Sequence, residues 1–61
     1  MPENLLKEFI DKECSITLIG DIQTEFVGKV IAVEGYWIKI LEMNDVRVIN
    51  GALIRDIKTN L

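Results

Sequence analysis

Apolar residues recur every three to four positions at the start of the chain, the spacing of one face of an α-helix. The members of this stripe are Leu5, Leu6, Phe9 and Ile10. Pro2 suits the first helical position, and Glu3 complements the positive end of the helix dipole. Glu3 and Lys7, and likewise Glu8 and Lys12, carry opposite charges at i,i+4 spacing in the favourable orientation. The pattern predicts a short amphipathic helix over residues 3–12, which must dock on another element to be stable.

After Glu13 the apolar period shortens to two, which is typical of half-buried β-strands. The alternation predicts five strands, over residues 14–19, 22–33, 36–43, 46–49 and 53–58. Turn-forming pairs separate them: Gly20-Asp21, Glu34-Gly35, Asn44-Asp45 and Asn50-Gly51. The chain therefore has the pattern of a mainly β protein with an N-terminal helix.

The second predicted strand is unusually long for a small protein, at about twelve residues against the usual three to ten. Gly28 lies inside it, and a glycine within a strand often marks a sharp bend at the corner of a barrel. A bent strand can serve both halves of a small barrel. The order of elements predicts one domain over residues 1–61, with five strands in a strongly bent, open barrel.

Alternation also predicts which way the third strand directs its side chains. Tyr36, Ile38 and Ile40 fall on one face, and Trp37, Lys39 and Leu41 fall on the other. If the isoleucines point into the barrel, Trp37 points outward. An outward tryptophan often marks an interface, and the alternative is that the N-terminal helix or a neighbouring strand covers it.

Composition narrows the classes of function. The 61 residues are 49% apolar, which is more than one small core can hide and favours self-association. The chain has no His, and its single Cys14 lies in a predicted strand, so we expect a buried thiol and no catalytic residues. Glu42, Asn44 and Asp45 share a turn, but without the spacing of a metal-binding loop they indicate a solvated turn.

These counts predict a protein that is not an enzyme and has no metal site, cofactor or small-molecule substrate. One cysteine suits a reducing compartment, and no segment has the pattern of a signal peptide or a membrane span. We therefore expect a cytoplasmic protein that does not interact with membranes. The net charge of −3 is divided unevenly, because residues 1–35 carry −4 and residues 36–61 carry +1.

Two stretches resemble the Sm-like (LSm/Hfq-type) family of small β-barrels. FVGKVIAVEGYWIKIL, from Phe26 to Leu41, is similar to the first motif of that family, with Gly28 as the bend glycine and Tyr36 as the aromatic residue. VINGALIRDI is similar to the second motif, with Ile54-Arg55 in the place of its Ile-Arg pair. The resemblance spans nearly the whole chain, although other small SH3-like barrels share much of the pattern.

The resemblance implies a site for short single-stranded RNA, formed by Tyr36, Asn50, Arg55 and Lys39. Ile38 stands where the family has an RNA-contacting Asn, and Asp56 stands where a Gly often follows Ile-Arg. The Lys-His pair of the bacterial branch has no counterpart here. The alternative is that Tyr36 caps the barrel core and Arg55 pairs with a neighbouring carboxylate across the interface between copies, such as that of Asp56.

The resemblance also implies a homo-oligomer, a ring or dimer, in which the fourth strand of one copy pairs with the fifth strand of the next. The predicted interface comprises Val46, Arg47, Val48, Ile49, Leu53, Ile54 and Ile57. Neither strand contains proline; the alternative is that loops cover both edges. Two functions follow as hypotheses: an RNA-binding ring, or a protein-interaction scaffold that has lost RNA binding.

Overall fold

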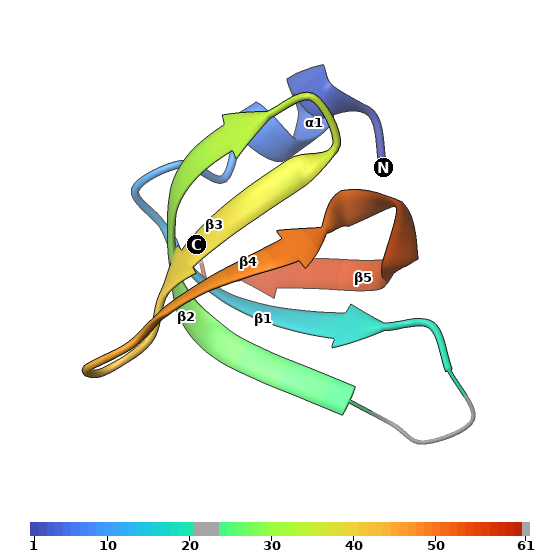
Figure 1. The fold of residues 1–61 in the computed structure, drawn as a ribbon. Helices are drawn as coiled ribbons and strands as arrows, with labels where there is room; N and C mark the ends of the chain where they lie inside the picture. Colours follow the sequence, from blue (N-terminus) through green and yellow to red (C-terminus); the bar gives the residue numbers. More distant parts are fainter. Residues whose placement is uncertain (21–23, 61) are drawn as a thin grey trace.

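Five antiparallel strands in one open sheet follow a short N-terminal helix in the computed structural model, which describes residues 1–20 and 24–60 (Figure 1). The elements are α1 (Glu3–Lys7), β1 (Glu13–Leu18), β2 (Thr24–Glu34), β3 (Trp37–Leu41), β4 (Val46–Asn50), the 3₁₀ turn η1 (Gly51–Leu53) and β5 (Ile54–Thr59). The order of strands in the sheet is β4-β3-β2-β1-β5. The predicted fold class, a helix followed by a five-stranded, open and mainly β structure, is confirmed.

The long β2 strand joins the two halves of the sheet and curves strongly between them (Figure 1). Its first half pairs with β1, and its second half pairs with β3. Lys29 belongs to both pairings, opposite Glu13 on one side and Leu41 on the other. A strand of this length is needed because one continuous segment serves as the neighbour of two others.

Gly28 lies next to Lys29, the residue of β2 that pairs with both β1 and β3. A Cβ atom at this position would come within 2.6 Å of Cγ2 of Ile40 and 2.7 Å of the backbone oxygen of Leu41. Cβ atoms essentially never come so close to another heavy atom. The end of β3 can therefore lie this close to β2 only because residue 28 is a glycine.

The core lies inside the curved sheet, under α1. It consists of Leu6, Cys14, Ile16, Val30, Ile38, Ile40, Ile49 and Ile54. The alternation predicted for the third strand is confirmed from residue 37 to residue 41, because Ile38 and Ile40 are buried and Trp37, Lys39 and Leu41 are exposed. The predicted burial of Cys14 is also confirmed.

The helix is shorter than the sequence pattern predicts, five residues rather than the ten of 3–12. Asp11 adopts a left-handed backbone conformation, with φ 71°, and its N–H donates to the carbonyl of Val30 at 2.7 Å. This tertiary hydrogen bond draws the chain onto β2 and ends the helical path before Lys12. Phe9 and Ile10 still pack against the core, but from turns that follow the helix.

The strand boundaries also differ from those predicted. The third strand is Trp37–Leu41 rather than 36–43, because Tyr36 belongs to the turn before it and Glu42 closes the turn after it, with its N–H bonded to the carbonyl of Asp45 at 2.8 Å. The other strands start or end within one residue of the prediction, except that predicted residues 22 and 23 lie outside the described part of the chain.

Candidate functional site

An exposed aromatic pair stands at the turn between β2 and β3. The ring centroids of Tyr36 and Trp37 are 5.4 Å apart, with a tilt of 35° between the ring planes. Gly35 has φ 60°, which allows the tight turn that the sequence predicted there. The prediction that Tyr36 shares the inner face of Ile38 is wrong: Tyr36 is 53% exposed, because it lies in the turn and not on the strand. It therefore does not cap the core.

The first residue of α1 fixes this turn from the side. The N–H of Gly35 donates to Oε2 of Glu3 at 2.9 Å, and Nζ of Lys7 lies 3.5 Å from the same oxygen. These two interactions, the backbone hydrogen bond above all, hold the pKa of Glu3 below its ordinary value. Helix and aromatic turn are thus connected through one carboxylate.

Asn50 and Gly51 lie beside the same turn. Asn50 is paired across the sheet with Trp37, and the N–H of Gly51 donates to the carbonyl of Tyr36. The Asn50 side chain accepts a hydrogen bond from the Ala52 N–H at 2.9 Å, so it caps η1. The structure therefore brings two of the four predicted RNA-binding residues, Tyr36 and Asn50, into one neighbourhood.

Arg55 is not part of that neighbourhood. Its Nε donates to Oδ2 of Asp56 at 3.2 Å, and both side chains are largely exposed. Within residues 1–20 and 24–60, Arg55 has no hydrogen bond, ion pair or ring contact with Tyr36. The alternative placed the carboxylate partner of Arg55 across an interface, whereas the structure pairs Arg55 with the adjacent residue of its own chain.

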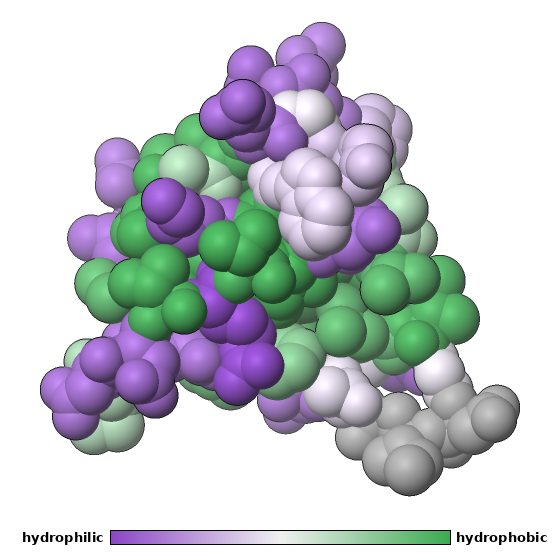
Figure 2. All heavy atoms as spheres, in the orientation of Figure 1, coloured by the Kyte–Doolittle hydropathy of each residue, from purple (hydrophilic) through white to green (hydrophobic). Residues whose placement is uncertain are grey.

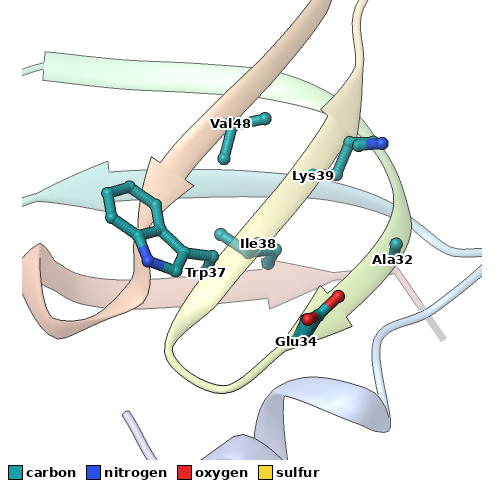
Figure 3. Close-up of a pocket in the computed structure, with 6 residues that line it drawn as sticks. All are labelled: Ala32, Glu34, Trp37, Ile38, Lys39 and Val48. Carbon is teal, nitrogen blue, oxygen red and sulfur yellow. The ribbon is translucent and has the colours of Figure 1, made fainter.

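Lys39, the fourth predicted residue, projects from the outer face of β3. With Ala32, Glu34, Trp37, Ile38 and Val48 it lines a shallow groove of about 280 Å³ (Figure 3). The groove is mainly apolar, and its lining residues come from the neighbouring strands β2, β3 and β4.

The strands β4 and β5 form the two ends of the sheet, as the predicted oligomer requires of its pairing strands. Apart from Arg47, the predicted interface residues fall into a buried group and an exposed group. Ile49 and Ile54 belong to the core, and Ile57 packs against it. Val46, Val48 and Leu53 are exposed.

Arg47 is engaged within the chain in two ways. Its Nε lies 3.1 Å from Oε1 of Glu42, and its guanidinium carbon lies 4.1 Å from the ring centroid of Phe26. Arg47 thus covers the open end of the core, where β4 passes the first half of β2. Sequence reasoning missed this contact, because residues 26 and 47 meet only once the sheet has curved.

No feature of the described residues indicates catalysis or metal binding. Burial raises the pKa of the Cys14 thiol, so this cysteine is a poor nucleophile. In the same part of the chain, no group of three or more His, Cys, Asp or Glu side chains is placed to hold a metal ion. Nor does any helix of the described ranges have the length and apolar character to cross a membrane.

Comparison with protein-family models, with curated protein sequences and with solved structures finds no match to this chain. The resemblance to Sm-like proteins thus stays a prediction from the two sequence motifs.

Proposed function

We propose that this protein is an Sm-like module that assembles with copies of itself through its sheet edges and acts as a protein-interaction scaffold. The observation that carries the proposal is the strand order β4-β3-β2-β1-β5, which leaves β4 and β5 without a neighbouring strand on one side. The backbone N–H and C=O groups of an edge strand pair readily with another strand.

The side chains on these strands support pairing through the backbone. Ile49 and Ile54 point into the core and anchor each edge strand to its own barrel. Neither β4 nor β5 contains proline, and η1 connects them without running along either edge. A head-to-tail contact between β4 of one copy and β5 of the next uses two different surfaces, and such contacts close into a ring when the rotation permits.

Charge favours protein over nucleic acid as the further partner. The chain carries −3, and phosphate binding depends on cationic side chains that release counterions. Arg47 and Arg55 are each occupied by a carboxylate of their own chain, Glu42 and Asp56. An assembly of several copies multiplies the negative charge.

The first experiment is the mass of the native protein, with the ratio of absorbance at 260 and 280 nm measured on the same peak. We expect a mass of several chains and a low ratio. Proline is then placed at Lys58 and at Thr59 in separate variants. Of two successive residues in an edge strand, one directs its N–H to the neighbouring strand and the other to the free edge.

The proline variant that keeps the native circular dichroism spectrum is the one that removes an N–H from the free edge, and we expect it to lose the assembly. A folded free-edge variant with the mass of the unaltered protein would contradict pairing through β5. A single-chain mass for the unaltered protein would contradict self-assembly altogether.

A second candidate function, binding of short single-stranded RNA, is favoured by the exposed Tyr36–Trp37 pair beside Asn50. Stacking of a base on an aromatic side chain contributes about 1–3 kcal/mol. Fluorescence anisotropy of labelled oligo(U) and oligo(A) at low salt tests it. On this hypothesis Tyr36→Ala weakens binding roughly 5- to 150-fold, and added salt weakens it further. An absence of binding at low salt would exclude RNA.

A further inference from the structure

The outer surface of β3 and β4 is unusually apolar for a surface facing water. Four large apolar side chains, Trp37, Leu41, Val46 and Val48, are between 42% and 58% exposed there. Figure 2 shows hydrophobic spheres gathered over these strands, in the orientation of Figure 1. We call this surface the outer face and include in it Ala32, Glu34 and Lys39 from the same side of β2 and β3.

The pairing register arranges the outer face in rows that cross the strands. Glu34, Trp37 and Asn50 form one row, and Ala32, Lys39 and Val48 form the next. Leu41 and Val46 follow in a third row. The first two rows hold one acidic and one basic side chain, so their charges balance although the whole chain carries −3.

We propose that the outer face binds the outer face of a second copy of this chain, around a two-fold axis. An axis that crosses the strands between the first two rows sets Lys39 of each copy opposite Trp37 of its partner copy and beside that copy's Glu34. The same axis sets Tyr36, just beyond the first row, opposite Leu41 in the third. Each cation then meets an aromatic ring and a carboxylate, and Tyr36 meets an apolar side chain.

Charge makes a second copy the best occupant. A two-fold contact brings each surface against itself, which is favourable only where opposite charges can face one another. The outer face meets that condition with Glu34 and Lys39, whereas a strongly acidic or basic partner would leave one of them opposed by a like charge.

This contact is separate from pairing through the strand edges. It uses side chains that point away from the core, whereas edge pairing uses backbone groups in the plane of the sheet. Both contacts can exist in one assembly, in which the outer-face contact joins two oligomers that each form through the strand edges. Either contact can also be absent while the other forms, so a measurement of the native mass and the Trp37 emission distinguishes the two proposals.

Trp37 is the only tryptophan of the chain and lies in the first row of the outer face, so its fluorescence reports the contact. Emission and sedimentation are measured over a dilution series. We expect the mass to halve on dilution and the Trp37 emission to shift to the red at the same concentration, because water replaces the partner copy around the indole.

Charge variants then test the arrangement. Lys39→Glu puts two acids on each face, and Glu34→Lys puts two bases there. We expect each single variant to weaken the contact at least tenfold and the double variant E34K/K39E to restore it to within about threefold. Val27→Lys is the matched control, because Val27 is an exposed residue of the same strand β2 outside the outer face, and we expect it to leave the contact unchanged.

Several results would overturn the proposal. One is a Trp37 emission that stays red at every concentration, and another is a blue emission that no dilution changes. A third is a double variant as weak as either single one while its circular dichroism remains native. If the proline variant at the free edge lowers the mass but leaves the dilution-dependent emission shift in place, the outer-face contact stands independently of edge pairing.

Discussion

The two faces of β3 carry similar apolar content but have opposite surroundings. Ile38 and Ile40 are fully buried, while Trp37 and Leu41, one position away from them, are nearly half exposed. The inner face meets the curved sheet and the helix, so every apolar side chain on it has neighbours. On the outer face the apolar side chains stay nearly half exposed in the single chain. The contrast shows that the fold of the single chain covers only one side of β3.

The outer side of β3 is exposed because the domain is small. A chain of 61 residues forms one layer of sheet and a five-residue helix, and that helix covers the end of the barrel rather than the outside of β3 and β4. The alternative that the helix shields Trp37 is therefore wrong for the structure of the single chain. Exposed apolar side chains that gather on one surface often mark an interaction site.

The largest expected effect comes from truncating the inner face. Ile40→Ala removes a fully buried side chain, and such changes cost about 2–5 kcal/mol. A domain of this size has a total stability of roughly 3–9 kcal/mol, so the loss is comparable with the whole. We expect this variant to be largely unfolded or to have a strongly lowered urea midpoint by circular dichroism.

Leu41→Ala is the matched control on the outer face. At concentrations where the protein is dissociated, we expect it to change the free energy of unfolding by no more than about 0.5 kcal/mol, as for most surface substitutions. Equal losses for residues 40 and 41 in dilute solution would contradict the division into a covered face and an open one. A loss at Leu41 that grows with protein concentration would support the outer-face contact.

The next largest effect is expected for Gly28→Ala, which tests how closely β3 lies against β2. Gly28→Ala places a methyl group against Ile40 and the backbone oxygen of Leu41, and a backbone oxygen cannot move aside as a flexible side chain can. We expect a loss of about 1–3 kcal/mol, typical of overpacking, in urea denaturation.

Gly35→Ala serves as the comparison for that variant. Apart from the two neighbouring residues in the chain, no atom of the described residues lies within 4 Å of a Cβ built at Gly35, but its φ is 60°. We therefore expect only the cost of a left-handed alanine, about 1–2 kcal/mol. A greater loss at Gly35 than at Gly28 would show that turn conformation, and not the crossing of the strands, limits substitution in this region.

The smallest effect concerns the link between α1 and the aromatic turn. Because the folded-state pKa of Glu3 is depressed, its stabilisation is fully present above the ordinary carboxyl value of 4.5 and is lost as the pH falls through the folded-state pKa. We expect Glu3→Gln to lower the melting temperature slightly at neutral pH and to match the unaltered protein in strong acid.

Glu8→Gln is the control for the pH measurement, because Glu8 is exposed and its side chain has no hydrogen bond or ion pair within the described ranges. We expect no such pH-dependent difference between this variant and the unaltered protein. If the Glu3→Gln difference persists unchanged below the folded-state pKa, the hydrogen bond from Gly35 is not its source.

The predicted RNA site illustrates what a sequence motif can and cannot supply. Trp37 pairs with Asn50 as neighbouring antiparallel strands require, and Tyr36 therefore comes close to Asn50. Arg55 was grouped with them through the resemblance alone. Its guanidinium instead bonds to Asp56, a choice that depends on side-chain rotamers and local charge rather than on the order of strands.

Period-two hydrophobicity and glycine geometry act over a few residues, so the element order, the turn at Gly35 and the inward alternation of Ile38 and Ile40 follow from the sequence. The length of the helix, the contact between Arg47 and Phe26, and the two edges of the sheet follow only from the fold. Each of these depends on segments far apart in the chain that meet after β2 has curved. Local pattern fixes which way a side chain points, and the curvature of the sheet decides what it meets there.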